Sequence, residues 1–149
     1  MSAAQIRPAA AADIPALLDL LKLLFSIEKD FVFNAAKQER GLRMLLASPQ
    51  AAVIVAAQGG QVIGMCTGQL LISTAQGGPS ALVEDVAVLP AHQGKGLGRR
   101  LVAAAEAWAV SHGASRIQLL ADRNNAPALA FYQKTGLQST AMICLRKML

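Results

Sequence analysis

The chain has 149 residues, of which 54% are hydrophobic and 15% charged, and its formal net charge is +5. This length fits one domain, residues 1–149, around a single core. Two cysteines are too few for a disulfide scaffold, and neither belongs to a CxxC pair, so no metal is expected. The basic residues form no run and aromatic residues are few, so no nucleic acid partner is expected.

A long uncharged stretch lies between Arg43 and Glu84. Polar and glycine-rich turns interrupt it, so no part of it reaches the roughly 20 apolar residues that a membrane span requires. Residues 1–7 lack the apolar core of a signal peptide, and a cytoplasmic protein without a membrane partner is therefore expected. The apolar surplus favours buried strands and a homodimer.

Hydrophobic periodicity and turn residues predict the elements in chain order. The first half comprises a strand at 5–7, a helix from an N-cap at Asp13 to Ile27, a second helix at 35–47, and a hairpin of strands at 52–57 and 61–73. The second half comprises a strand at 81–89, a helix that ends before Gly113, a strand at 116–121, a helix at 126–135, and one or two strands within 137–145.

A glycine-rich loop joins the strand at 81–89 to the helix that follows it. Its three alternate glycines, Gly94, Gly96 and Gly98, allow close approach of a ligand to backbone N–H groups, and the helix adds its positive end. Such a site suits a pyrophosphate. A Walker loop is excluded because Gly96 follows Lys95, and the dinucleotide fingerprint fails because Arg99 replaces its third glycine.

Two blocks of the sequence resemble the GCN5-related N-acetyltransferase (GNAT) family. The segment Gln93-Gly94-Lys95-Gly96-Leu97-Gly98 matches the family signature Q/R-x-x-G-x-G/A, and Val88-Leu89-Pro90 is similar to the end of its fourth strand. The segment from Asn125 to Leu137 resembles N-x-x-A-x-x-L/F-Y-x-x-x-G-F, and the opening Ile6-Arg7-Pro8-Ala9 is also similar. The resemblance covers nearly the whole chain.

The resemblance implies an α/β (α+β) fold: a mixed, mostly antiparallel sheet of six or seven strands, splayed between the fourth and fifth, with about four flanking helices. It also implies acetyl-CoA as cosubstrate. The pantetheine arm would lie in the splay against Val86, Ala87, Val88, Asn125 and Tyr132. The pyrophosphate would be surrounded by Gln93, Gly94, Lys95, Gly96, Leu97, Gly98 and Arg99.

Acetyl transfer to an amine requires an acceptor for the amine proton and a donor to the leaving thiolate. By resemblance, Tyr132 is the acid and Glu84 is the base, acting in a ternary complex in which the amine attacks directly. Strand alternation predicts that Glu84 and its neighbour Asp85 point to opposite faces. Three alternatives stay open: Tyr132 as a core tyrosine, either carboxylate as the partner of a basic residue, and Asp85, another group or water as the base in place of Glu84.

The acceptor is the least determined part of the prediction. Glu28 and Asp30, in the loop after the first helix, could attract a cationic amine or could be solvated loop charges. Together with Glu84 and Asp85 they form the candidate substrate site. The resemblance favours a small amine of the diamine or polyamine type. A peptide or protein N-terminus or lysine, and a module that binds acyl-CoA without catalysis, are the alternatives.

Overall fold

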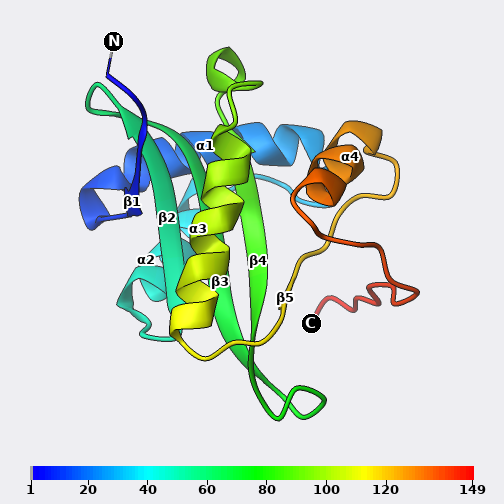
Figure 1. Ribbon diagram of the computed structural model, residues 1–149. Coiled ribbons are helices and arrows are strands. Elements are labelled where there is room, and N and C mark those ends of the chain that lie inside the picture. The colour runs from blue at the N-terminus through cyan, green and yellow to red at the C-terminus, as the bar shows by residue number, and fades with distance from the viewer. Residues whose placement is uncertain (1) are drawn as a thin grey trace.

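A five-stranded sheet runs through the middle of the computed structural model, which describes residues 2–149 (Figure 1). Its strands follow one another in sequence order: β1 (Gln5–Pro8), β2 (Ala51–Gln58), β3 (Gln61–Ser73), β4 (Gly78–Val88) and β5 (Ile117–Gln118). The helices are α1 (Ile14–Ile27), α2 (Ala35–Ala47), α3 (Leu97–Ser111) and α4 (Ala126–Lys134), with short 3-10 turns η1 (Ala11–Asp13) and η2 (Pro90–His92).

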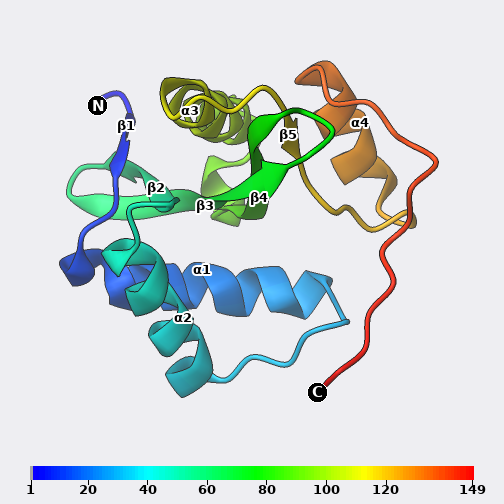
Figure 2. The same ribbon diagram turned by 90° about the horizontal axis from the view of Figure 1, so that it is seen from below.

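The helices cover both faces of this sheet. Figure 2 shows α1 and α2 on one face and α3 on the other, with α4 on the same side as α3. The first four strands pair antiparallel, and β5 joins β4 in parallel. This arrangement confirms the predicted mixed, mostly antiparallel sheet with helices on both faces.

Two apolar clusters, one on each face of the sheet, hold the layers together. On one face, Leu17 of α1 and Val55 of β2 are fully buried. On the other, Leu101 of α3 packs with Cys66 of β3. The buried residues of α1, Ile14, Leu17, Leu20 and Leu21, recur at the spacing of an amphipathic helix. No helix in the described part of the chain is long and apolar enough to cross a membrane.

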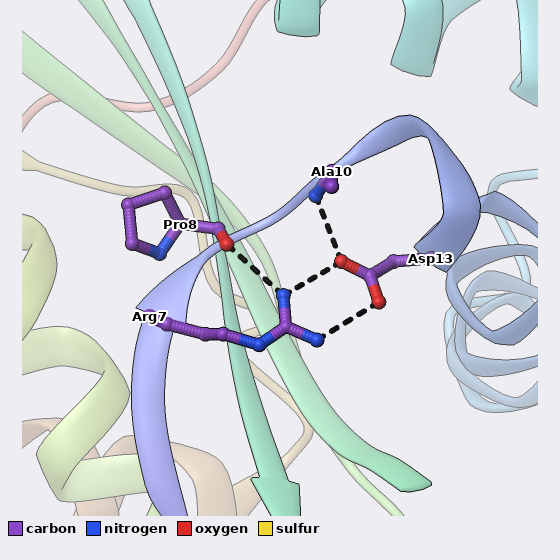
Figure 3. A network of polar contacts seen from close by, with 4 residues as sticks. All are labelled: Arg7, Pro8, Ala10 and Asp13. Atoms are coloured by element: carbon purple, nitrogen blue, oxygen red, sulfur yellow. Dashed lines mark hydrogen bonds and ion pairs between the residues drawn. The ribbon is translucent and has the colours of Figure 1, made fainter. Parts of the chain in front are cut away.

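Asp13 occupies the N-cap position of α1, as predicted, but its side chain forms an ion pair instead of a cap. Asp13 makes no side-chain cap for α1. Its carboxylate instead accepts hydrogen bonds from both terminal nitrogens of Arg7, at 2.8 and 3.0 Å, and from the Ala10 N–H at 2.8 Å (Figure 3). The Arg7 guanidinium holds the pKa of Asp13 below its usual range. This network ties β1 to the helix that follows.

The predicted strand number, six or seven, is too high by at least one. The strand expected at 116–121 is paired over Ile117–Gln118 alone, and residues 137–149 contribute no strand within the described structure. Apolar side chains in this tail, among them Met142 and Leu145, are exposed. The sequence has strand character there, but a strand also requires a partner edge, and the tail has none.

The short β5 leaves most of β4 without a neighbour on that side. The two strands pair at Ala81 with Ile117 and at Leu82 with Gln118, whereas β4 continues to Val88. The predicted splay between the fourth and fifth strands is therefore confirmed. The segment Val83–Val88 borders this opening and leads directly into the glycine-rich loop.

Candidate active site

A β-bulge distorts β4 at the level of the splay. Thr67 of β3 pairs with Glu84, but Met65 pairs with Ala87, so Asp85 and Val86 together face one residue of β3. Asp85 has φ of 55°, the sole non-glycine residue with a positive φ in the described chain. An extra residue in one strand breaks the alternation of side chains that follows from a regular strand.

The bulge brings Glu84 and Asp85 to the same face, and the prediction of opposite faces is wrong. Glu84 shares a face with its cross-strand partner Thr67. The Asp85 Oδ2 atom lies 3.3 Å from the Thr67 Oγ1 atom, on that same face. Met65, two residues before Thr67, packs in the cluster that contains Leu17 of α1. Both carboxylates therefore lie on the α1 side of the sheet.

The two carboxylates differ in environment. Glu84 is exposed, whereas Asp85 is partly buried. Burial, with smaller contributions from the nearby Glu84 and Glu28 carboxylates, raises the pKa of Asp85 to about 6, although the Thr67 hydroxyl acts in the opposite direction. A carboxyl group with this pKa changes its protonation state close to neutral pH, as a general base does.

Glu28 links these strand residues to the loop after α1. Burial raises the pKa of Glu28, and neighbouring carboxylates raise it further. Glu84, Asp30 and Asp122 each lie close enough to Glu28 to raise its pKa, and Glu84 and Glu28 do the same to Asp85. These five carboxylates, Glu28, Asp30, Glu84, Asp85 and Asp122, are called the acidic group below. The predicted substrate residues are thus brought together, and the structure adds Asp122, which follows β5.

Tyr132 of α4 lies close enough to Glu28 of the acidic group for this carboxylate to affect its pKa. Burial raises the pKa of its hydroxyl to about 12, with further contributions from the Glu28 carboxylate and the Cys66 thiol. The hydroxyl therefore stays protonated over the whole physiological range. No residue of α4 is fully buried, and the Tyr132 and Phe131 side chains are partly buried. The adjacent Phe131 ring lies over Gly98 of α3, where a Cβ atom would come within 3.1 Å of it.

The glycine-rich loop has the geometry of an anion site. Gly94 and Gly96 have φ of 74° and 80°, and the space beside their Cα atoms is open. Within the described structure, no N–H group from Gly94 to Arg99 donates to a protein acceptor, whereas the next one, that of Arg100, bonds the Gly96 carbonyl. Unsatisfied N–H groups at the start of a helix suit a pyrophosphate.

Side chains predicted to hold the cofactor already make contacts within the protein. Gln93 donates to the Val88 carbonyl at 2.9 Å, and Lys95 donates to the Ala91 carbonyl at 3.2 Å. The Asn125 side-chain oxygen accepts the Ala128 N–H and caps α4, which leaves its amide N–H groups available. The Arg99 side chain is exposed. The loop backbone, more than these side chains, is therefore preformed for a ligand.

Three residues of the site were not found from the sequence. Thr67 looked like one more residue of an apolar strand, but it is fully buried and contacts Asp85. Asp122 lies in the segment after β5 and belongs to no recognisable sequence motif. Arg146, in the C-terminal tail, pairs with Asp30 at 3.3 Å. A threonine between the apolar residues of β3 is a weak signal, and nothing in the sequence indicates the other two.

Comparisons with known proteins agree with this geometry. The model of the acetyltransferase (GNAT) family matches residues 15–137. An aminoglycoside N(6')-acetyltransferase type 1 from Acinetobacter haemolyticus is 26% identical over 141 residues, 93% of each protein. A streptothricin acetyltransferase from Streptomyces lavendulae is 41% identical over 54 residues, 36% of this chain and 29% of that protein.

A solved structure extends the likeness to the fold. The aminoglycoside N-acetyltransferase AAC(6')-Iy in complex with CoA has a TM-score of 0.87 to this chain, at 18% sequence identity, and the match covers 99% of this chain and 96% of that one. The family match includes the splay, the loop and α4. The chain therefore belongs to the acetyltransferase (GNAT) family, and it is an acetyl-CoA-dependent N-acetyltransferase.

Proposed function

We propose that the protein acetylates a primary amine of a small polycationic molecule, of the diamine, polyamine or aminoglycoside class. The observation that carries this proposal is the concentration of negative charge beside Tyr132. The chain has a net charge of +5 and nine acidic residues, and five of the nine form the acidic group. Carboxylates that repel one another are stabilised when cations lie between them.

The relatives support the same class of acceptor. One is named for acetylating aminoglycosides and another for acetylating streptothricin. The carboxylates come from three separate parts of the chain, β4, the loop after α1 and the segment after β5. Negative charge contributed by several segments suits an acceptor that carries several ammonium groups.

For the cosubstrate, the loop backbone from Gly94 to Arg99 is proposed to bind the pyrophosphate of acetyl-CoA. The free N–H groups of this segment support that role. Val86, Ala87 and Val88 border the splay, where β4 has no strand partner beyond Leu82, and they are proposed to bind the pantetheine arm by backbone pairing. The free amide N–H groups of Asn125 are proposed to donate to the same arm.

In the reaction, acetyl-CoA supplies an activated acetyl group as a thioester. We assign the base to Asp85 rather than to Glu84, because its pKa of about 6 leaves it deprotonated at neutral pH yet able to hold a proton. Asp85 takes one proton from the acceptor ammonium, and the freed lone pair attacks the thioester carbon. Glu84, which is exposed, is proposed to bind the acceptor's charge.

Tyr132 completes the transfer. As the C–N bond forms and the C–S bond breaks, the Tyr132 hydroxyl gives its proton to the sulfur and is reprotonated by the second nitrogen proton. The products are the amide and the free thiol. Its raised pKa favours the neutral hydroxyl, which can donate a hydrogen bond to a developing thiolate throughout the reaction.

A thiol-release assay with acetyl-CoA tests the function. The acceptors are 1,4-diaminobutane, spermidine, an aminoglycoside, single amino acids and short peptides. We expect thiol release with the polycationic amines, and kcat/KM at least about tenfold higher than for uncharged or singly charged amines. Thiol release with peptides alone would identify a peptide acceptor, and binding of acetyl-CoA without release by any amine would identify a non-catalytic module.

A further inference from the structure

The C-terminal tail, residues 137–149, crosses from the α4 side of the molecule toward the loop between α1 and α2. Figure 2 shows this path, with the tail ending near that loop. The tail forms no helix or strand, and its apolar side chains Met142, Ile143 and Leu145 are exposed. Within the described chain, the ion pair that joins the tail to the rest of the protein is the one between Arg146 and Asp30.

Arg146 makes two contacts with this loop. Its Nη1 atom lies 3.3 Å from the Asp30 Oδ2 atom, and its guanidinium carbon lies 5.1 Å from the centroid of the Phe31 ring. Phe31 in turn packs on Phe25 of α1, with the ring centroids 5.4 Å apart. The guanidinium is thus held between a carboxylate and an aromatic face, the arrangement that also binds a ligand ammonium.

Arg146 is also the basic residue of the protein that pairs with a carboxylate of the acidic group. Among residues 2–149, no other basic side chain lies within 4.0 Å of a carboxylate of this group, because the two remaining ion pairs of the protein are Arg7–Asp13 and Arg43–Glu39. The Arg146 and Asp30 side chains are 42% and 73% exposed. An exposed pair of this kind contributes little free energy, so a competing cation can replace it.

We propose that Arg146 determines acceptor specificity by occupying the position that a second ammonium group of the substrate takes at Asp30. This inference rests on the proposed function, since the acceptor's reacting amine must lie at Asp85. An acceptor with one charge reaches Asp85 and leaves the Arg146–Asp30 pair intact. An acceptor with two charges displaces Arg146, pairs with Asp30 and frees the tail.

Two substitutions break the same ion pair and separate this role from a structural one. Arg146→Gln removes the competing cation and leaves Asp30 for the substrate, so KM for 1,4-diaminobutane should fall about two- to fivefold relative to KM for 1-aminobutane. Asp30→Asn removes the carboxylate that receives the second ammonium, so the same KM ratio should rise. A merely structural contact would shift the ratio in one direction in both variants.

Matched variants and a binding measurement complete the test. Arg146→Lys keeps the charge and should retain most of the wild-type ratio. Arg43→Ala removes another exposed ion pair, on α2 and outside the acidic group, and should leave the ratio unchanged. Calorimetric titration with 1,4-diaminobutane, in the absence of acetyl-CoA, should show the same opposite shifts in Kd. If the wild type turns over and the KM ratio is the same in all variants, Arg146 does not determine specificity, although the proposed function stands. If the wild type acetylates neither amine, the proposed function itself is overturned.

Discussion

Asp85 combines backbone strain with a partly buried charge. Its φ of 55° is unusual for a residue with a side chain and costs on the order of 1 kcal/mol. Burial of its carboxyl group adds a penalty for ionisation, which is visible in the pKa of about 6. Such costs persist where the surrounding structure imposes them, and here the bulge opposite β3 and the Thr67 hydroxyl hold the carboxylate in position.

Replacing Asp85 with asparagine should abolish a pH dependence of catalysis. In the wild type we expect kcat/KM to rise through a midpoint near pH 6, as Asp85 loses its proton and becomes the base. Asp85→Asn tolerates the left-handed backbone but cannot take a proton, so the rise should disappear and kcat should fall about 100-fold or more. A pH–rate profile from pH 5 to 9 measures both effects.

The melting temperature provides an independent check on the same residue. The folded-state pKa of Asp85 is raised above its unfolded value, so its contribution to stability is present at low pH and is lost as the pH rises through about 6. Asp85→Asn should therefore raise Tm at pH 7.5 by several degrees and change it little at pH 4. As a control for the kinetic measurement, Tyr132→Phe should lower kcat without moving the midpoint of the pH–rate profile. If Asp85→Asn leaves that profile unchanged, Asp85 is not the base and Glu84 becomes the candidate again.

Among the elements, α4 makes a close contact with the start of α3. It contributes no buried residue, and its Phe131 ring lies against the Gly98 backbone at the start of α3. The sequence motif explains Gly98 by the approach of a phosphate, but in the folded chain the nearest group is an aromatic ring. Since Tyr132 follows Phe131, this glycine also sets how far the hydroxyl stands from the sheet.

Two glycine-to-alanine substitutions in helices should have opposite effects. Gly98→Ala would bring a Cβ within 3.1 Å of the Phe131 ring, so we expect α4 to shift, with kcat reduced about tenfold or more and Tm unchanged or lower. Gly41→Ala, in α2, has open space around it and should raise stability by about 0.5–1 kcal/mol without changing kcat. Thermal melts and steady-state kinetics of both variants measure the difference.

The helices were largely predictable, and the strands were less so. The predicted helices at 35–47 and 126–135 match α2 and α4 within one residue. Both begin at an asparagine cap, Asn34 and Asn125, and α4 ends before Gly136, and such signals act locally. The strand predicted at 116–121 is reduced to β5, and those within 137–145 do not form, because pairing requires a neighbour that the local sequence does not specify. The bulge at Asp85 was also missed, since it depends on the register against β3.

For the whole molecule, charge separation is the main electrostatic feature. The chain is basic overall, yet most of its acidic residues lie in the acidic group, whereas Lys95, Arg99 and Arg100 lie at the glycine-rich loop. The proposed amine acceptor is cationic and acetyl-CoA is anionic, so each would be attracted to a different part of the surface. The homodimer expected from the apolar surplus stays a prediction, as does the cytoplasmic location.

Binding of acetyl-CoA should stabilise the whole fold. A ligand that binds the native state alone adds about 2.7 kcal/mol at one hundred times its Kd, which corresponds to a rise in Tm of roughly 5–10 °C for a chain of this size. Gly96→Ala, at a position with φ of 80°, should distort the loop and reduce this rise. A melt with and without millimolar acetyl-CoA measures it, and an unchanged Tm for the wild type would contradict binding at the loop.

The sequence by itself determined the family, the glycine-rich loop and the candidate residues Tyr132, Glu84 and Asp85, because these depend on local spacing and on side-chain chemistry. Only the tertiary structure decided that Glu84 and Asp85 share a face, that Thr67 touches Asp85, and that Arg146 reaches Asp30 across 116 positions. The register of the strands and the path of the tail are set by packing between segments that are distant in sequence, so no local sequence pattern predicts them.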